Sequence, residues 1–204
     1  MSKIKYGKKN LIEYEDKIAD LFNSKKIRAP IHLYYGNEDE IINVFKIIKK
    51  NDWVFCSWRS HYQCLLKGVP EDILTKSILE GKSISLFFKK YKIFSSAIVA
   101  GTLPIALGTA ISIKKNKQNN KVFCFIGDMT AETGMAYECI KYSYNMKLPI
   151  KFIIEDNNIS VCTPTRKTWG IKDLSIYEKY KSKIILYKYK NKYPHAGAGK
   201  RVQF

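Results

Sequence analysis

The sequence predicts an α/β fold in which a parallel sheet is flanked by helices. Two apolar runs of strand length, 121–126 and 150–155, end in polar residues, Gly127-Asp128 after the first and Asp156-Asn157-Asn158 after the second. A helical pattern at 133–146 separates them, so strand, helix and strand follow one another as in a βαβ unit. The carboxyl ends of the two strands are then neighbours at one edge of the sheet, where open α/β proteins bind ligands.

Further helices are predicted from apolar residues at helical spacing, over 10–24, 38–50 and 70–81. The last of these begins with a proline and two acidic residues, which suit the first turn of a helix. Residues 95–113 are apolar enough to raise the question of a membrane span. Because that segment holds a proline, two glycines and many hydroxyl groups, we expect a buried core helix there instead.

Further strands are predicted over 52–57 and 184–189, where aromatic and β-branched residues gather. Residues 82–95 show little periodicity and are expected to form a loop. A length of 204 residues suits one domain. We therefore expect residues 1–204 to form a single domain with an N-terminal helix and a C-terminal tail.

The composition favours a globular protein of the cytoplasm. Apolar residues make up 46% of the chain, and five cysteines occur singly without metal-ligand spacing, as expected for buried reduced thiols. The net charge of +18 invites a nucleic-acid interpretation, but lysine supplies nearly all of it and no basic stripe with interleaved aromatics is present. Nucleic-acid binding is therefore not favoured, whereas an acidic partner or an anionic substrate stays open.

The polar strand ends predict a cation site. A carboxylate and an amide oxygen are hard ligands suited to Mg²⁺, and such sites usually complete the octahedron with ligand phosphates and water. The pair therefore points to a metal-held diphosphate. Acidic and amide residues also form turns by themselves, and that alternative stays open at this point.

Five motifs resemble those of the alpha subunits of thiamine-diphosphate-dependent 2-oxo acid dehydrogenases of the pyruvate and branched-chain type. They are His32–Glu38 (HLYYGNE), Asp52–His61 (DWVFCSWRSH), Lys67–Pro70 (KGVP), Ala97–Gly108 (AIVAGTLPIALG) and the Gly127-Asp128 to Asn157-Asn158 pair. The resemblance covers about residues 30–165 and returns in the tail. It implies a three-layer thiamine-diphosphate-binding fold.

The resemblance implies a site for thiamine diphosphate and Mg²⁺. The metal ligands it implies are Asp128, Asn157 and the backbone carbonyl of Ile159. The cofactor contacts it implies are Trp58, Arg59, Ala97, Val99, Gly127, Asp128, Met129, Thr130, Asn157 and Ile159. Two positions depart from the family pattern: Trp58 replaces a tyrosine, and Met129 replaces the glycine that lets backbone approach the phosphates.

Two histidines are candidate catalytic residues by the same resemblance. His195 is similar to a histidine that faces the cofactor, with a flexible tail as the alternative. His61 is expected at the mouth of the site, with a capping or core histidine as the alternative.

The implied function is that of an alpha-type subunit acting on a 2-oxo acid. Thiamine chemistry needs a glutamate against the aminopyrimidine ring, and in the family a beta-type subunit supplies it, so the resemblance implies a heterotetramer that is active only when assembled. Transketolase-like details around Asp128 keep a split ketol transferase as one alternative. A basic nucleic-acid-binding or scaffold protein on the same fold is the other.

Overall fold

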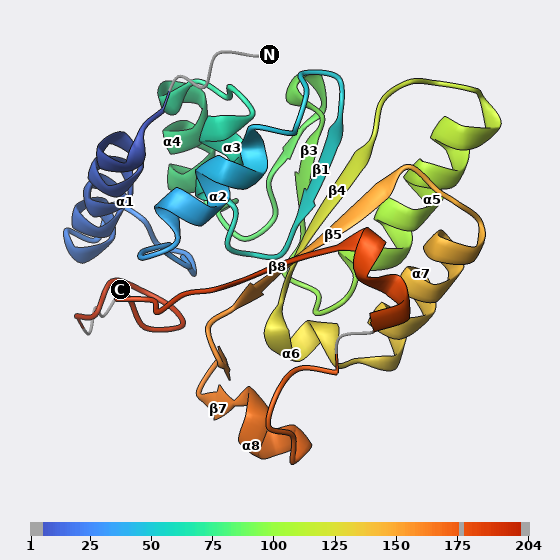
Figure 1. The fold of residues 1–204 in the computed structure, drawn as a ribbon. Helices are drawn as coiled ribbons and strands as arrows, with labels where there is room; N and C mark the ends of the chain where they lie inside the picture. The colour runs from blue at the N-terminus through green and yellow to red at the C-terminus, as the bar shows by residue number, and fades with distance from the viewer. Residues whose placement is uncertain (1–5, 176–177, 201–204) are drawn as a thin grey trace.

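The computed structural model describes residues 6–175 and 178–200, and a six-stranded sheet lies at its centre (Figure 1). In spatial order the strands are β2 (Phe87–Phe88), β3 (Ile93–Ser95), β1 (Trp53–Cys56), β4 (Val122–Gly127), β5 (Ile150–Asp156) and β8 (Ile184–Lys188). The five strands from β3 to β8 run parallel, and β2 is antiparallel at the edge. The expected parallel sheet flanked by helices is confirmed.

Helices cover both faces of the sheet (Figure 1). One group is α1 (Lys8–Asn23), α2 (Glu38–Phe45), α3 (His61–Leu66) and α4 (Glu71–Leu79), and the other is α5 (Thr102–Lys115) and α7 (Gly134–Asn145). Along β4, Phe123 and Phe125 pack into the core of the first group, while Val122, Cys124 and Ile126 pack into the second. A strand buried on both faces needs apolar residues at every position, which explains the continuous run in the sequence.

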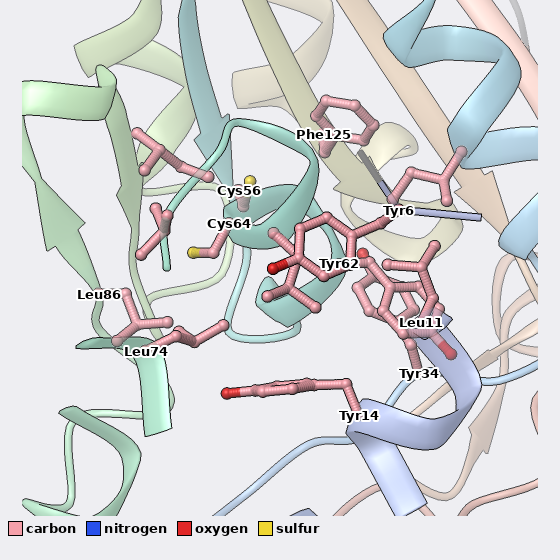
Figure 2. Close-up of a cluster of buried hydrophobic side chains, with 14 of the residues drawn as sticks. Tyr6, Leu11, Tyr14, Tyr34, Cys56, Tyr62, Cys64, Leu74, Leu86 and Phe125 are labelled. Atoms are coloured by element: carbon pink, nitrogen blue, oxygen red, sulfur yellow. The ribbon is translucent and has the colours of Figure 1, made fainter. Parts of the chain in front are cut away.

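The first core is rich in aromatic and sulfur-containing side chains, and Figure 2 shows part of it. The Tyr34 and Tyr62 rings stack with centroids 4.9 Å apart. Cys56 and Cys64 are buried here, and Cys124 and Cys139 are buried in the second core, as expected. Cys162 is exposed, against that expectation, because it lies in the short hairpin that follows β5.

The expected loop at 82–95 contains strands. After Ser85 the chain forms β2, a 3-10 turn η1 (Lys89–Tyr91) and β3, and β3 pairs in parallel with β1 from Ile93 to Ser95. These strands have two and three residues, too few to show an alternating pattern. They form strands because β3 pairs with the edge of β1 and β2 pairs with β3, which is a tertiary effect.

The apolar segment 95–113 is a helix only from Thr102 onwards, and it is buried on one side. Leu103, Ala106 and Ala110 pack into the second core, whereas Ile105 is 48% exposed. Within residues 6–175 and 178–200, every helix is too short or too polar to cross a membrane.

Short elements and the tail complete one edge of the sheet. A two-stranded hairpin, β6 (Ile159–Ser160) and β7 (Thr163–Pro164), leads into α8 (Thr165–Trp169), and the 3-10 helix η2 (Glu178–Lys183) precedes β8. The tail then returns to the N-terminal half. The Gly197 amide donates a hydrogen bond to the Ile31 carbonyl (2.9 Å), and Gly197 bridges to His32.

Candidate functional site

A cavity of about 940 Å³ lies at the carboxyl ends of the central parallel strands. Most of its wall comes from chain segments that follow strands: 57–59 after β1, 127–130 at the end of β4, 157–162 after β5, and 189–191 with 193–196 after β8. Because these strands are parallel, their carboxyl ends share one edge. The predicted meeting of the Asp128 and Asn157 strand ends is therefore confirmed.

Asp128 begins the short helix α6 (Asp128–Ala131) and is 2% exposed. Its Oδ2 atom is buried and has no hydrogen-bond partner among the described residues. Burial raises the pKa of this carboxyl above its ordinary value. A buried acceptor that receives no hydrogen bond is costly, so this oxygen is available to bind a ligand.

Asn157 and Ile159 lie in the same cavity wall as Asp128. Asn158, between them, has a left-handed backbone (φ 60°), and the Asn157 Oδ1 atom accepts a hydrogen bond from the Ile159 amide (3.2 Å). The described part of the chain holds no group of three His, Cys, Asp or Glu side chains placed for a metal. Asn157 and Ile159 add an amide oxygen and a backbone carbonyl to the cavity that Asp128 lines, and together with that carboxylate they form a donor set that suits Mg²⁺ with phosphate and water.

Arg166, on α8, reaches the same strand ends and was not predicted from the sequence. Its guanidinium donates to both carboxylate oxygens of Asp156, at 2.7 and 2.5 Å, and to Asn158 Oδ1 at 3.1 Å. Its Nη1 atom lies 3.9 Å from Asp128 Oδ2. The available signal was the scarcity of arginine in a lysine-rich chain, since four arginines stand among 36 basic residues.

Met129 occupies the position of the motif glycine and is held in place by α8. The Trp169 indole N–H donates to the Met129 sulfur at 3.0 Å. The thioether therefore packs against α8 at the rim, and Met129 and Thr130 both lie in the cavity wall as expected.

Arg59 places a positive charge in the cavity wall, in the segment that follows β1. Its Nε–H donates to the Leu33 carbonyl (3.0 Å), and its guanidinium lies 5.7 Å from the centroid of the Tyr34 ring. Leu33 and Tyr34, in the segment between α1 and α2, thus hold the Arg59 side chain in place. A planar, permanently charged group held in this way suits a phosphate.

His195 is brought to the cavity by the tail. Its ring packs edge-on against His32 (centroids 4.6 Å apart) and Trp58 (5.8 Å), and its carbonyl lies 2.5 Å from His32 Nδ1. Burial lowers the pKa of His195, and it lowers the pKa of His32 to about 4. The expected grouping of His195, Trp58 and Arg59 at one cavity is observed.

Glu155 is a buried carboxyl in the cavity wall that was not predicted as a site residue. It accepts hydrogen bonds from the hydroxyl groups of Tyr34 (2.8 Å) and Tyr187. Burial raises its pKa to about 7, against the opposing effect of both tyrosines.

His61 does not lie at the mouth of the cavity, contrary to expectation. It is fully buried, with Nδ1 2.9 Å from Glu15 Oε2 and Nε2 2.9 Å from Ser83 Oγ. Both ring nitrogens are satisfied inside the first core, so the alternative of a core histidine describes its position.

Ala97 and Val99 lie outside the cavity wall, in the exposed loop between β3 and α5. Both residues are exposed, Val99 by 53%. Only their backbone groups are expected to contact the cofactor, and the structure does not bring them into the pocket formed by this chain.

Comparison with known proteins places the sequence among 2-oxo acid dehydrogenase components. The sequence model described as dehydrogenase E1 component matches residues 6–179. The pyruvate dehydrogenase E1 component subunit alpha of Rickettsia prowazekii (strain Madrid E) is 32% identical over 182 residues, covering 84% of this chain and 55% of that protein. The corresponding subunit of Porphyra purpurea is 27% identical over 178 residues, covering 79% and 52%. The chain spans about half the length of these curated relatives.

Proposed function

The chain belongs to the dehydrogenase E1 component family, and on that premise we propose that it is an alpha-type subunit of a thiamine-diphosphate- and Mg²⁺-dependent enzyme acting on a 2-oxo acid. The observation that carries the proposal is the buried Asp128 Oδ2 atom, which accepts no hydrogen bond from the described residues, in a cavity shared with Asn157 and Arg59. When bound, thiamine diphosphate supplies the electron sink for loss of CO₂ from a 2-oxo acid.

The residues of this chain hold and orient the diphosphate end. Asp128, Asn157 and the Ile159 carbonyl would hold Mg²⁺, and the Arg59 guanidinium would offset phosphate charge. The burial of Asp128 strengthens its interaction with a cation because buried charges are weakly screened. His195, whose ring packs against Trp58, would contact the substrate carboxylate or the group derived from it.

A beta-type subunit, in a heterotetramer, is the proposed partner. The loop 97–101 and the start of α5 expose apolar side chains, with Ile98 73% and Ile105 48% exposed. Water-exposed apolar groups gathered beside a functional cavity are typical of a surface that another chain covers. The chain alone is therefore expected to release no CO₂ from 2-oxo acids, and the assembled enzyme is expected to release it without needing an aldehyde acceptor. Aldehyde-dependent ketol transfer would instead identify the transketolase-like alternative.

Calorimetric titration with thiamine diphosphate and Mg²⁺ tests the site directly. We expect metal-dependent binding to the unmodified chain, and its loss in Asp128→Ala and in Asn157→Ala, because each variant removes one proposed metal ligand. Asp39→Asn is the matched control: it changes an exposed carboxylate that is paired with Lys8 and is not part of the cavity wall, so this variant should bind normally. Retained metal-dependent binding in both cavity variants would overturn the ligand assignment.

A further inference from the structure

Two carboxylates and one guanidinium are packed together at the ends of β4 and β5. Asp128 and Asp156 are each 2% exposed, and the Arg166 side chain is 18% exposed. The Arg166 guanidinium donates hydrogen bonds to both carboxylate oxygens of Asp156. Its Nη1 atom lies 3.9 Å from Asp128 Oδ2, which accepts no hydrogen bond from the described residues. Two buried like charges repel strongly unless a cation lies beside them. In the described residues that cation is Arg166.

The short helix that carries Arg166 is tied to both strand ends. The Thr165 amide donates to the Asn158 carbonyl (3.2 Å), which joins α8 to the turn after β5. The Trp169 indole bonds the Met129 sulfur, which joins α8 to the turn after β4. These attachments hold the guanidinium beside the carboxylates without closing the cavity, since Arg166 is not part of its wall.

Two of the bonds that hold Arg166 and its helix in place go to the motif segments themselves. Asp156, directly before the Asn157-Asn158 pair, has a negative charge that Arg166 neutralises. Met129, at the position of the motif glycine, provides the sulfur atom that accepts the Trp169 hydrogen bond. The carboxylate and the arginine therefore form one unit.

We propose that Arg166 is a tethered cation that neutralises the Asp128–Asp156 pair in the metal-free chain and thereby weakens divalent-cation binding at Asp128. The inference rests on the proposed function, because it assumes that Asp128 is a metal ligand. A divalent cation that binds beside Asp128 would be repelled by the positive charge of Arg166, because the protein holds this guanidinium in place. The site consequently retains its shape without metal and releases the metal more readily than a site lacking the arginine.

Charge variants measured without cofactor or substrate test this proposal. Mn²⁺ is titrated onto the chain and free Mn²⁺ is followed by its electron paramagnetic resonance signal. Arg166→Gln leaves both carboxylates and removes the positive charge, so we expect at least fivefold tighter Mn²⁺ binding and a lower melting temperature without metal. Arg166→Lys keeps the charge and should bind within about twofold of the unmodified chain.

A double variant keeps the test usable if Arg166→Gln does not fold. Asp156→Asn combined with Arg166→Gln removes one charge of each sign, leaves a neutral hydrogen-bonding pair, and should restore an affinity within about threefold of the original. Arg166→Gln binding no tighter than the unmodified chain would overturn the proposal, and so would a double variant that binds at least fivefold tighter.

The same titration tests the role of Arg166 separately from the proposal that Asp128 is a metal ligand. Asp128→Asn should abolish Mn²⁺ binding if Asp128 is a ligand. Unchanged binding in Asp128→Asn would overturn both the ligand assignment and the role of Arg166. Loss of binding in Asp128→Asn, with no effect of Arg166→Gln, would overturn the role of Arg166 alone.

Discussion

Gly36→Ala should destabilise the chain and also disturb the cofactor cavity. Gly36 has a backbone φ of +87°, and a Cβ atom built on it would lie 2.4 Å from the Lys190 carbonyl oxygen. That oxygen belongs to backbone after β8, and Lys190 lies in the cavity wall. The contact therefore cannot be relieved by rotating a side chain, and relief must move the wall.

The expected magnitude has two parts. A side chain held at positive φ costs about 1–2 kcal/mol per residue, and a methyl group forced into a packed site costs about 1–3 kcal/mol. Gly68 separates them, because it has nearly the same φ of +88° and open space where its Cβ would lie. Gly68→Ala should thus lower the free energy of unfolding by about 1–2 kcal/mol, and Gly36→Ala by about 2–5 kcal/mol.

Urea unfolding followed by circular dichroism measures both losses. Calorimetry with thiamine diphosphate and Mg²⁺ adds a second comparison: Gly36→Ala should weaken binding because Lys190 is displaced, while Gly68→Ala should leave it unchanged. Equal destabilisation by the two variants would refute the contact with Lys190, and unaltered cofactor binding by Gly36→Ala would refute its link to the cavity.

Three further predictions address burial and access. The pKa of His32 is lowered to about 4, so the unfolded chain takes up a proton that the folded chain excludes; stability present above pH 6.5 is lost as pH falls towards 4. In His32→Gln the free energy of unfolding in urea should therefore depend less on pH between 6.5 and 4. The fall that His32 causes in the unmodified chain should reach up to about 3 kcal/mol at the acid end of this range. Tyr34→Phe should lower the free energy of unfolding by about 1–3 kcal/mol in the same assay, since Glu155 and Gln63 lose a buried partner. Cys162 should be the one thiol that reacts rapidly with a chromogenic disulfide, and thiamine diphosphate with Mg²⁺ should slow the reaction because Cys162 lines the cavity.

The strands that shape the site could be predicted because their burial on both faces leaves a continuous apolar run. This holds for β4 and β5, whose ends carry Asp128 and Asn157. It fails for β3, which has three residues and depends on the edge of β1. The length of an element thus decided whether its sequence alone revealed it.

Side-chain partners were less predictable than strands. The motif around His61 indicated a site position, but Glu15 and Ser83, 46 and 22 residues away, occupy both ring nitrogens. Arg166 was missed because its partner Asp156 lies ten residues earlier, across a hairpin of two-residue strands. Such pairings depend on how the chain folds back, which local spacing does not encode.

The return of the tail to the N-terminal half has a consequence for how the molecule forms. His32 and the His195 carbonyl are 163 residues apart in sequence, and the Asn191 amide that donates to the Leu33 carbonyl is 158 residues from it. Contacts this distant require closure of nearly the whole chain, and folds that depend on them form slowly. The sheet from β1 to β5 depends on closer pairings than these and is expected to form first. The wall that carries His195 then closes last, so a folding molecule passes through a stage with its sheet built and its cavity open.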